Sequence, residues 1–379
     1  MTFSFARFLG ALVALVAWVT PLDAQRWQVQ YFYDRNKSSL AIGDLSFASA
    51  VRGVAVGSIH EGSRQRPVAL VTSDGGAHWQ LVPLKEEPLS LFFLNENIGW
   101  MVTEKGLWQT TEAGKSWTKM PRVPGQIFRV YFKDEKNGWA AGARKTVLET
   151  HDGGQQWTRV AAAAEQPGTV ESSAYEWIAF ATPQLGVITG WNRPPERAFT
   201  PQLPAWIDPE AALHHREWPH LGLSLETHDG GKTWKSASAS VFGQVTHIRF
   251  GPPGAGLGLV EFSETFQYPS EVYRIKWPAG GNERIYRDKQ FAVTDVSVTP
   301  DGTGYLSGIV VAGELRSVVP GRVRVLKSRD FSTWTDIEVD YRAVANRTTM
   351  AAADDHDIWL ATDNGMILKL EQQNTIPSP

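Results

Sequence analysis

The chain contains no cysteine, which excludes disulfides, thiol nucleophiles and thiolate metal sites. Any exported form of the protein is therefore held together by packing alone. The sequence also lacks an excess of charge of either sign, with 37 Lys and Arg against 40 Asp and Glu and a net charge of −3. Nucleic-acid-binding proteins typically carry a basic face or stripe. The charge balance therefore argues against a nucleic-acid partner.

Long apolar runs are scarce, and the one at the N-terminus is short. It extends from Phe8 to Val19 and follows a single Arg7, whereas a membrane-spanning helix needs ~20 apolar residues. We interpret residues 1–24 as a signal peptide that is cleaved after Ala24. The protein is then expected to be exported, periplasmic or extracellular, without a membrane span in the mature chain. An uncleaved N-terminal anchor is the alternative.

Glycine and tryptophan are abundant, with 34 and 16 residues respectively among the 379 of the chain. The chain is 42% hydrophobic and 20% charged, which is typical of a folded globular protein. This combination favours many short strands, joined by tight turns, with large side chains filling the space between layers.

One short motif recurs along the chain. Its copies are "TSDGGAHW" (72–79), "TTEAGKSW" (110–117), "THDGGQQW" (150–157) and "THDGGKTW" (227–234), with a shortened form "SRDFSTW" (328–334). A catalytic motif normally occurs once, so we interpret this one as architectural. The acid is expected to accept N–H groups of its own turn, the glycines to adopt positive φ, and the Trp to begin the return strand and pack under the turn. The structural residues so assigned are Asp74, Trp79, Glu112, Trp117, Asp152, Trp157, Asp229 and Trp234.

A second repeat alternates with the first and consists of an apolar residue, five variable residues and usually Gly. Its seven copies begin at Phe47, Phe93, Phe132, Phe180, Phe250, Val298 and Ala352, at intervals of 39 to 70 residues. Four copies carry a further glycine, at Gly57, Gly142, Gly190 and Gly308. A repeat of this length indicates a propeller or another repeat array.

The two repeats together predict an all-β fold, a single seven-bladed β-propeller of four-stranded antiparallel blades over residues 25–379. The last copy is not followed by a Trp strand, whereas residues 26–32, "RWQVQYF", resemble the outer strand of a blade. We therefore expect the N-terminal strand to close the ring, which removes the edges that an open array would expose.

These interlocked patterns resemble the Asp-box, or bacterial neuraminidase, repeat. More specifically, "FKDEKNGWAAG" (132–142) followed by "THDGGQQW" resembles the alternation found in the photosystem II stability and assembly factor family. The resemblance covers roughly residues 26–370 and implies an exported propeller. Plant and cyanobacterial members act as assembly chaperones through a basic surface patch. Here the arginines are dispersed along the sequence, so the photosystem partner is not carried over.

Sialidases share the Asp box, so hydrolysis has to be considered. The chain has no "RIP" motif, and "QIFRVYF" (126–132) is typical of an inner strand. The acidic run "DDHD" (354–357) aligns with turns of other repeats, which favours a solvated turn. We therefore predict no catalytic residues, no cofactor and no metal. A glycoside hydrolase or lectin-like sugar binder, with a glycan as its ligand, is the alternative function.

One segment, residues 190–222 in blade four, lies outside the repeat. Long aromatic loops on rigid scaffolds are frequent recognition elements. The candidate binding residues in this insertion are Trp191, Arg193, Trp206, His214, His215, Trp218 and His220. The alternative is that the insertion covers the propeller and buries its own tryptophans.

The repeat alignment also predicts a ring of side chains, three residues before each apolar anchor and on the opposite strand face. Its members are Asp44, Ser90, Arg129, Trp177, His247, Asp295 and Thr349. They are expected to line the mouth of a central channel or to form hydrogen bonds between neighbouring blades. Asp44, Arg129, Trp177, His247 and Asp295 are the best candidates for a binding site.

The sequence thus predicts an exported, non-enzymatic propeller that binds a protein partner in the cell envelope. The expected role is that of an assembly or stability factor.

Overall fold

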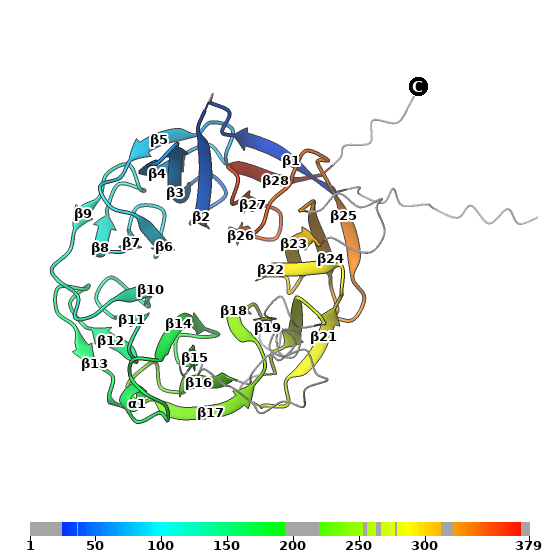
Figure 1. Ribbon diagram of the computed structural model, residues 1–379. Coiled ribbons are helices and arrows are strands. Elements are labelled where there is room, and N and C mark those ends of the chain that lie inside the picture. Colours follow the sequence, from blue (N-terminus) through cyan, green and yellow to red (C-terminus); the bar gives the residue numbers. More distant parts are fainter. Residues whose placement is uncertain are drawn as a thin grey trace, which may run out of the picture.

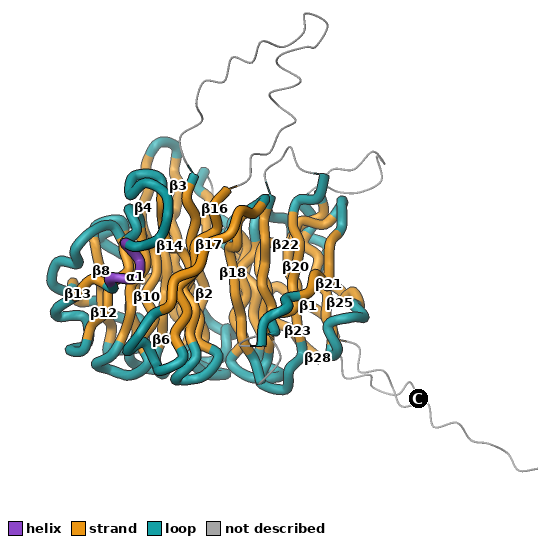
Figure 2. The backbone as a smooth tube through the Cα atoms, turned by 90° about the horizontal axis from the view of Figure 1, so that it is seen from below, coloured by secondary structure: helices purple, strands orange, loops and turns teal. Residues whose placement is uncertain are grey.

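A computed structural model describes residues 25–35, 37–193, 220–252, 256–262, 267–276, 279–311 and 321–372 of the chain. This part is almost entirely β-structure, and its one helix is the single turn α1 (Ala161–Ala164). The sheets are arranged radially around a central channel (Figure 1). The strands run between two faces on which the loops gather (Figure 2). Within the described ranges, no helix has the length and apolarity needed to cross a membrane.

Five sheets have four antiparallel strands each, and the chain passes through the strands of each sheet in order. The first sheet consists of β2 (Ser39–Phe47), β3 (Gly53–Glu61), β4 (Arg64–Thr72) and β5 (Gln80–Pro83). The second consists of β6 (Pro88–Phe93), β7 (Gly99–Thr103), β8 (Gly106–Thr110) and β9 (Thr118–Lys119). The third consists of β10 (Ile127–Phe132), β11 (Gly138–Gly142), β12 (Thr146–Thr150) and β13 (Thr158–Arg159). The fourth sheet consists of β14 (Ser173–Phe180), β15 (Gly186–Asn192), β16 (His220–Thr227) and β17 (Lys235–Val241). The fifth consists of β18 (Gln244–Phe250), β19 (Gly256–Glu261), β20 (Ser270–Arg274) and β21 (Glu283–Arg287). The first strand of each sheet lies at the channel and the fourth at the periphery (Figure 1).

The remaining strands form one sheet of eight, in the order β22-β23-β24-β25-β1-β28-β27-β26. Its strands are β22 (Phe291–Val298), β23 (Gly304–Val310), β24 (Val323–Ser328), β25 (Thr335–Val339), β26 (Thr348–Ala352), β27 (Ile358–Thr362), β28 (Met366–Gln372) and β1 (Gln25–Phe32). Strand β1 pairs antiparallel with β28, where Trp27 lies opposite Leu370, and parallel with β25, where Trp27 lies opposite Val339.

The expected count of seven four-stranded blades is not found as such, because the structure has five four-stranded sheets and one eight-stranded sheet. The physical reason is that β1 has two edges with free backbone groups, and each edge finds a partner strand. The all-β propeller architecture with four-stranded blades is confirmed.

The Asp-box turns have the geometry that their residue types favour. In the copy at 227–234, the Thr227 hydroxyl donates to Asp229 Oδ1 at 2.9 Å, and this oxygen accepts the Thr233 N–H at 2.9 Å. Gly230 and Gly231 have φ of 73° and 86°, which is the region that favours glycine. Residue Trp234 lies just before β17 rather than inside it, so the outer strand begins one residue later than expected.

Aromatic contacts hold the turns and the neighbouring sheets together. Each full Asp-box Trp meets the anchor Phe of its own sheet edge-on, as Trp157 does with Phe132 at 6.1 Å between ring centroids. The second strand of several sheets contributes another Trp that stacks on the anchor of the next sheet: Trp100 lies 3.7 Å from Phe132, and Trp359 lies 3.5 Å from Phe47. These rings lie in separate apolar clusters between successive sheets.

A β-bulge interrupts six of the inner strands. The pairing register shifts between residues 42 and 44, 88 and 90, 127 and 129, 175 and 177, 245 and 247, and 293 and 295. Opposite four of the bulges stands one of the additional glycines. A Cβ on Gly142 would lie 2.0 Å from the carbonyl oxygen of Gln126, and one on Gly190 would lie 2.1 Å from that of Ala174. The glycines are required because the bulged backbone approaches them closely.

Candidate functional site at the channel mouth

The six predicted ring residues on bulged strands each follow the bulge directly, from Asp44 on β2 to Asp295 on β22. A bulge re-aims the side chain that follows it. This local distortion explains why the ring residues of different sheets have equivalent positions at the channel.

Several ring side chains form hydrogen bonds with the next inner strand around the channel. Asp44 accepts the Leu91 N–H at 2.8 Å, and Asp295 accepts the Met350 N–H at 2.7 Å. Ser90 donates to the Phe128 carbonyl at 2.7 Å, and the Trp177 indole donates to that of Ile248 at 2.8 Å. The ring was expected either to line the channel mouth or to form hydrogen bonds between neighbouring blades. Some of its residues do both.

A cavity of about 370 Å³ lies at the end of the channel where the inner strands begin. Asp44, Arg129, Trp177, His247 and Thr349 line it. Asp295 is fully buried behind His247 and is not part of the lining. The structure thus brings four of the five main ring candidates to one cavity and places the fifth, Asp295, behind the lining in contact with His247.

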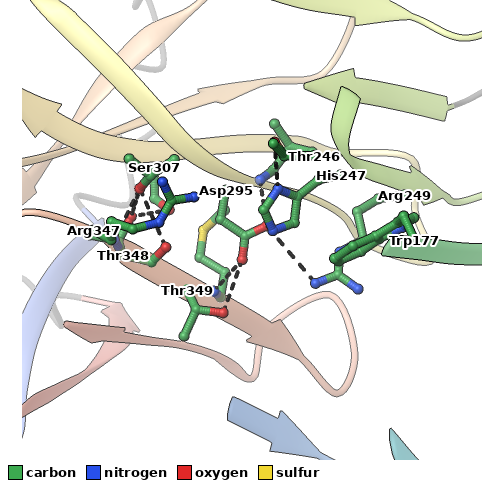
Figure 3. Close-up of polar contacts among 12 residues, drawn as sticks. Trp177, Thr246, His247, Arg249, Asp295, Ser307, Arg347, Thr348 and Thr349 are labelled. Carbon is green, nitrogen blue, oxygen red and sulfur yellow. Dashed lines mark hydrogen bonds and ion pairs between the residues drawn. The ribbon is translucent and has the colours of Figure 1, made fainter. Parts of the chain in front are cut away.

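Trp177 is the centre of a cationic and aromatic cluster in this cavity. The guanidinium carbon of Arg129 lies 4.0 Å from a ring centroid of Trp177, and that of Arg249 lies 4.9 Å away. The imidazole of His247 lies 4.4 Å from the indole. Figure 3 shows Trp177, Arg249 and His247 side by side, with Asp295 beyond the imidazole.

Burial determines the charge states in this cluster. It lowers the pKa of His247 well below its ordinary value, and the neighbouring Arg249 lowers it further, so the imidazole is neutral at pH 7. Burial also raises the pKa of Asp295, while Arg249 and the Met350 N–H oppose that rise. Burial lowers the pKa of Arg129, opposed by Asp44, but a guanidinium stays charged under ordinary conditions.

The sequence reasoning missed two arginines that line the cavity. Arg249 lies two residues after His247, and Arg347 lies two residues before Thr349. His247 and Arg249 both lie on β18, and alternation along a strand places such neighbours on the same face, so the signal for Arg249 was present in the sequence. Arg347 lies just before β26. Arg347 forms a two-pronged ion pair with Glu261, at 2.7 and 2.8 Å.

The insertion is described only at its two ends. Trp191 lies in β15 and Arg193 follows that strand, with the Arg193 guanidinium 5.0 Å from the Trp191 ring. His220 begins β16. The pKa of His220 is lowered by burial and by Arg193. Inner strands begin and second strands end on the same face, so these residues share the face of the channel-mouth cavity. Trp206, His214, His215 and Trp218 lie outside the described residues.

Two acidic groups considered as candidates for chemistry, Asp44 in the ring and Asp354 in the turn between β26 and β27, accept backbone hydrogen bonds. Both oxygens of Asp44 accept backbone N–H groups, from Leu45 and Leu91. In the "DDHD" run, Asp354 accepts the N–H groups of His356 and Asp357 at 2.8 Å, which is a turn. Over the described ranges, no group of three or more His, Asp or Glu side chains is placed to hold a metal ion.

Comparison with known proteins finds the same resemblance that the repeated motifs indicate. The family model described as "Photosynthesis system II assembly factor YCF48" matches residues 122–190. A "Photosystem II assembly lipoprotein Ycf48" of Synechococcus sp. (strain CC9902) is 21% identical over 308 residues, which cover 79% of this chain and 77% of that protein. The resemblance to photosystem II assembly factors is confirmed.

Solved structures show the same fold. "YCF48 bound to D1 peptide" superimposes with a TM-score of 0.58 and 16% identity, covering 90% of this chain and 99% of that one. "YCF48 from Cyanidioschyzon merolae" superimposes with a TM-score of 0.56 and 14% identity, covering 91% and 98%. At these identities the likeness establishes a shared fold.

Proposed function

We propose that the protein is an exported, non-enzymatic propeller that binds a protein partner and serves as an assembly or stability factor for an envelope complex. The resemblance to the assembly factors supports this proposal, since one of the similar structures contains a bound D1 peptide. Export is supported by the N-terminal sequence and by the lipoprotein among the relatives. Residues 1–24 are then the targeting segment and residues 25–379 the mature protein.

The proposed propeller has seven blades. Within the eight-stranded sheet, β22 to β25 form one unit of four strands, and β26 to β28 form a second unit that β1 completes. Adding these two units to the five separate sheets gives the seven repeats of the sequence. In this interpretation, the first and last strands of the chain close the ring.

The observation that carries the functional proposal is the pair of arginines stacked on Trp177. Arg129 lies 3.9 Å from Asp44, and Arg249 lies 3.9 Å from Asp295. The oxygens of both carboxylates already accept backbone N–H groups. Each guanidinium has five N–H donors, so hydrogen-bonding capacity remains for a ligand. We infer that the partner presents a carboxylate here, because arginine binds carboxylates with two parallel hydrogen bonds.

The glycosidase alternative needs two carboxyl groups free to exchange protons with a sugar. Backbone N–H groups occupy the oxygens of Asp44 and Asp295. The other two carboxylates of the cavity lining also accept hydrogen bonds, Glu87 from the Ser58 hydroxyl and Asp363 from the Asn346 N–H. We therefore do not propose hydrolysis.

The test is affinity capture from the envelope fraction, followed by reconstitution with the purified captured protein. We expect the double variant Arg129→Gln/Arg249→Gln to bind that partner about tenfold more weakly, because two charge-assisted contacts at the cavity are lost. A matched double variant, Arg159→Gln/Lys232→Gln, removes two charges from exposed positions outside the cavity and should bind normally.

A further variant replaces residues 193–219 by a short Gly/Ser linker. Loss of the partner in this variant alone would assign recognition to the insertion instead of the arginines. Normal binding by all variants would contradict the proposed site.

A further inference from the structure

The outermost strand of the fourth sheet, β17, has a long and regular backbone edge. The strand has seven residues, "KSASASV" (235–241), and pairs with β16 along its whole length without a register shift. Figure 1 shows it at the periphery of the ring. Each of its residues is exposed or half-buried. The edge that faces away from β16 therefore lies on the outside of the described ring.

The other outer strands have features that block pairing with a further strand. Strands β9 and β13 have two residues each, and β5 has four and ends in Pro83. Strand β21 carries three charged side chains among five residues, and its register with β20 shifts. Strand β25 is already paired with β1. Short length, charge, proline and bulges protect exposed edges, and of these β17 has a single charge, Lys235.

One side chain reveals the direction of the backbone groups of β17. Gln166 Nε2 donates to the carbonyl oxygens of Ser224 and Ala237, at 2.8 Å each. Two oxygens this close to one nitrogen belong to paired residues whose backbone groups point toward each other. Ala237 therefore directs its N–H and C=O toward its partner Ser224 on β16. By alternation, the three serines of β17 direct theirs away from β16.

These outward backbone groups belong to Ser236, Ser238 and Ser240. Each residue offers one N–H donor and one C=O acceptor. Among the described residues, the backbone groups that pair with β17 are those of β16. The side chains of Gln166 and Ser224 bond to the inward carbonyl of Ala237. The described part of the chain thus leaves the outer edge of β17 without a partner strand.

The chain itself shows what an edge in this position binds. Strand β25 is the outer strand of the unit β22–β25, and β1 pairs with its outer edge in parallel. Strand β1 comes from the other end of the sequence and is extended. Strand β17 holds the same place in its own sheet, fourth from the channel. An extended segment is therefore the ligand that this fold accepts at such an edge.

The side chains of β17 indicate which segment fits. Apart from Lys235 and Val241 they are serines and alanines, which leave room for large side chains on an added strand. β-branched residues fit such sheet positions well. Because β17 has one charge, an uncharged segment gains as much from the edge as a charged one and is desolvated more easily.

We propose that the outer edge of β17 binds an extended segment of another polypeptide, uncharged and rich in β-branched residues, as a fifth strand of the β14–β17 sheet. Main-chain hydrogen bonds to the three serines provide the affinity, as in other cases of strand addition. No residue of β17 lines the channel-mouth cavity. This site is therefore separate from the carboxylate contact and does not depend on the proposed function.

The probe is a fluorescently labelled heptapeptide of alternating Val and Thr, capped at both ends, titrated with the full mature chain and followed by anisotropy. We expect saturable binding. A matched peptide carries N-methyl groups on its central backbone nitrogens, which keeps every side chain and removes the N–H donors. It should bind about tenfold more weakly. The variant Arg129→Gln/Arg249→Gln should bind the unmethylated peptide normally, which separates this site from the channel mouth.

Ser238→Pro tests the edge from the protein side. It removes an outward N–H, which the ladder with β16 does not use, and should weaken binding about tenfold. Ser238→Ala keeps this N–H and should bind normally. Site-resolved hydrogen exchange of the unmodified protein gives a second measurement. The amides of the three serines should exchange rapidly in the free protein and slowly with the peptide, whereas that of Ala237 should be slow in both.

Equal binding of the two peptides would overturn the proposal, and so would serine amides whose exchange the peptide does not change. Both measurements use the unmodified protein, so they decide the question even if Ser238→Pro fails to fold. A dimer seen by sedimentation and abolished by Ser238→Pro would also overturn it, because a second copy of the chain would then occupy the edge.

Discussion

Replacing Gly142 by alanine tests whether the glycines opposite the bulges are required by close backbone approach. The new Cβ would lie 2.0 Å from the Gln126 oxygen and 2.6 Å from the Ile127 Cα. Both neighbours are backbone atoms, so the bulge itself must move. Overpacking of this kind costs ~1–3 kcal/mol, and the reduced freedom of the unfolded chain offsets ~0.4–1 kcal/mol of it. We therefore expect a net loss of about 1–2 kcal/mol of unfolding free energy.

The assay is equilibrium urea unfolding, and Gly43→Ala is the matched control. Gly43 lies in the bulge of β2, where the nearest atom to a new Cβ is 3.9 Å away. The control should be unchanged or slightly stabilised. Equal unfolding midpoints for the two variants would refute the reasoning, because the close approach would then carry no energetic cost.

Three further predictions concern charged and titrating groups. Asp295→Ala should lower the unfolding free energy by about 2–5 kcal/mol, measured in urea, since it leaves the buried N–H groups of Val296 and Met350 unpaired. Because the folded-state pKa of His247 lies below its ordinary 6.5, the unfolded chain binds a proton first, and stability should fall as pH drops below about 6.5. In His247→Gln this slope should be absent from thermal midpoints recorded between about pH 5 and 7. Hydrogen bonds from Thr233 lower the pKa of Asp229 from 3.8 to about 2, so its stabilisation should be lost as pH falls from about 4 towards 2, and Asp229→Asn should flatten that part of the profile.

The repeats made the ring predictable because equivalent positions in a repeat occupy equivalent places in space. One aligned position per strand was enough to find Asp44, Arg129, Trp177 and His247 at one cavity. Arg249 was missed because only one position per strand was followed, although alternation along β18 places it on the same face as His247. Arg347 was missed because it precedes β26 and so lies outside the strand pattern. The bulges were not predicted, since a register shift depends on the partner strand. The extra glycines of the second repeat, such as Gly142, lie opposite four of the bulges and were their signal in the sequence.

Other features depended on contacts between segments far apart in the sequence. The double pairing of β1 with β28 and β25 could not be predicted from its own residues, because any exposed strand edge can accept a neighbour.

The most direct test of the proposed function measures whether the arginines on Trp177 bind carboxylates of a polypeptide. A fluorescently labelled peptide rich in Asp and Glu, with a free C-terminal carboxylate, is titrated with the protein and followed by anisotropy. The account predicts binding that weakens in Arg129→Gln/Arg249→Gln and persists in Arg159→Gln/Lys232→Gln. It also predicts no binding of the same peptide with every carboxylate replaced by an amide. Equal binding of both peptides, or unchanged binding by the cavity variant, would contradict it.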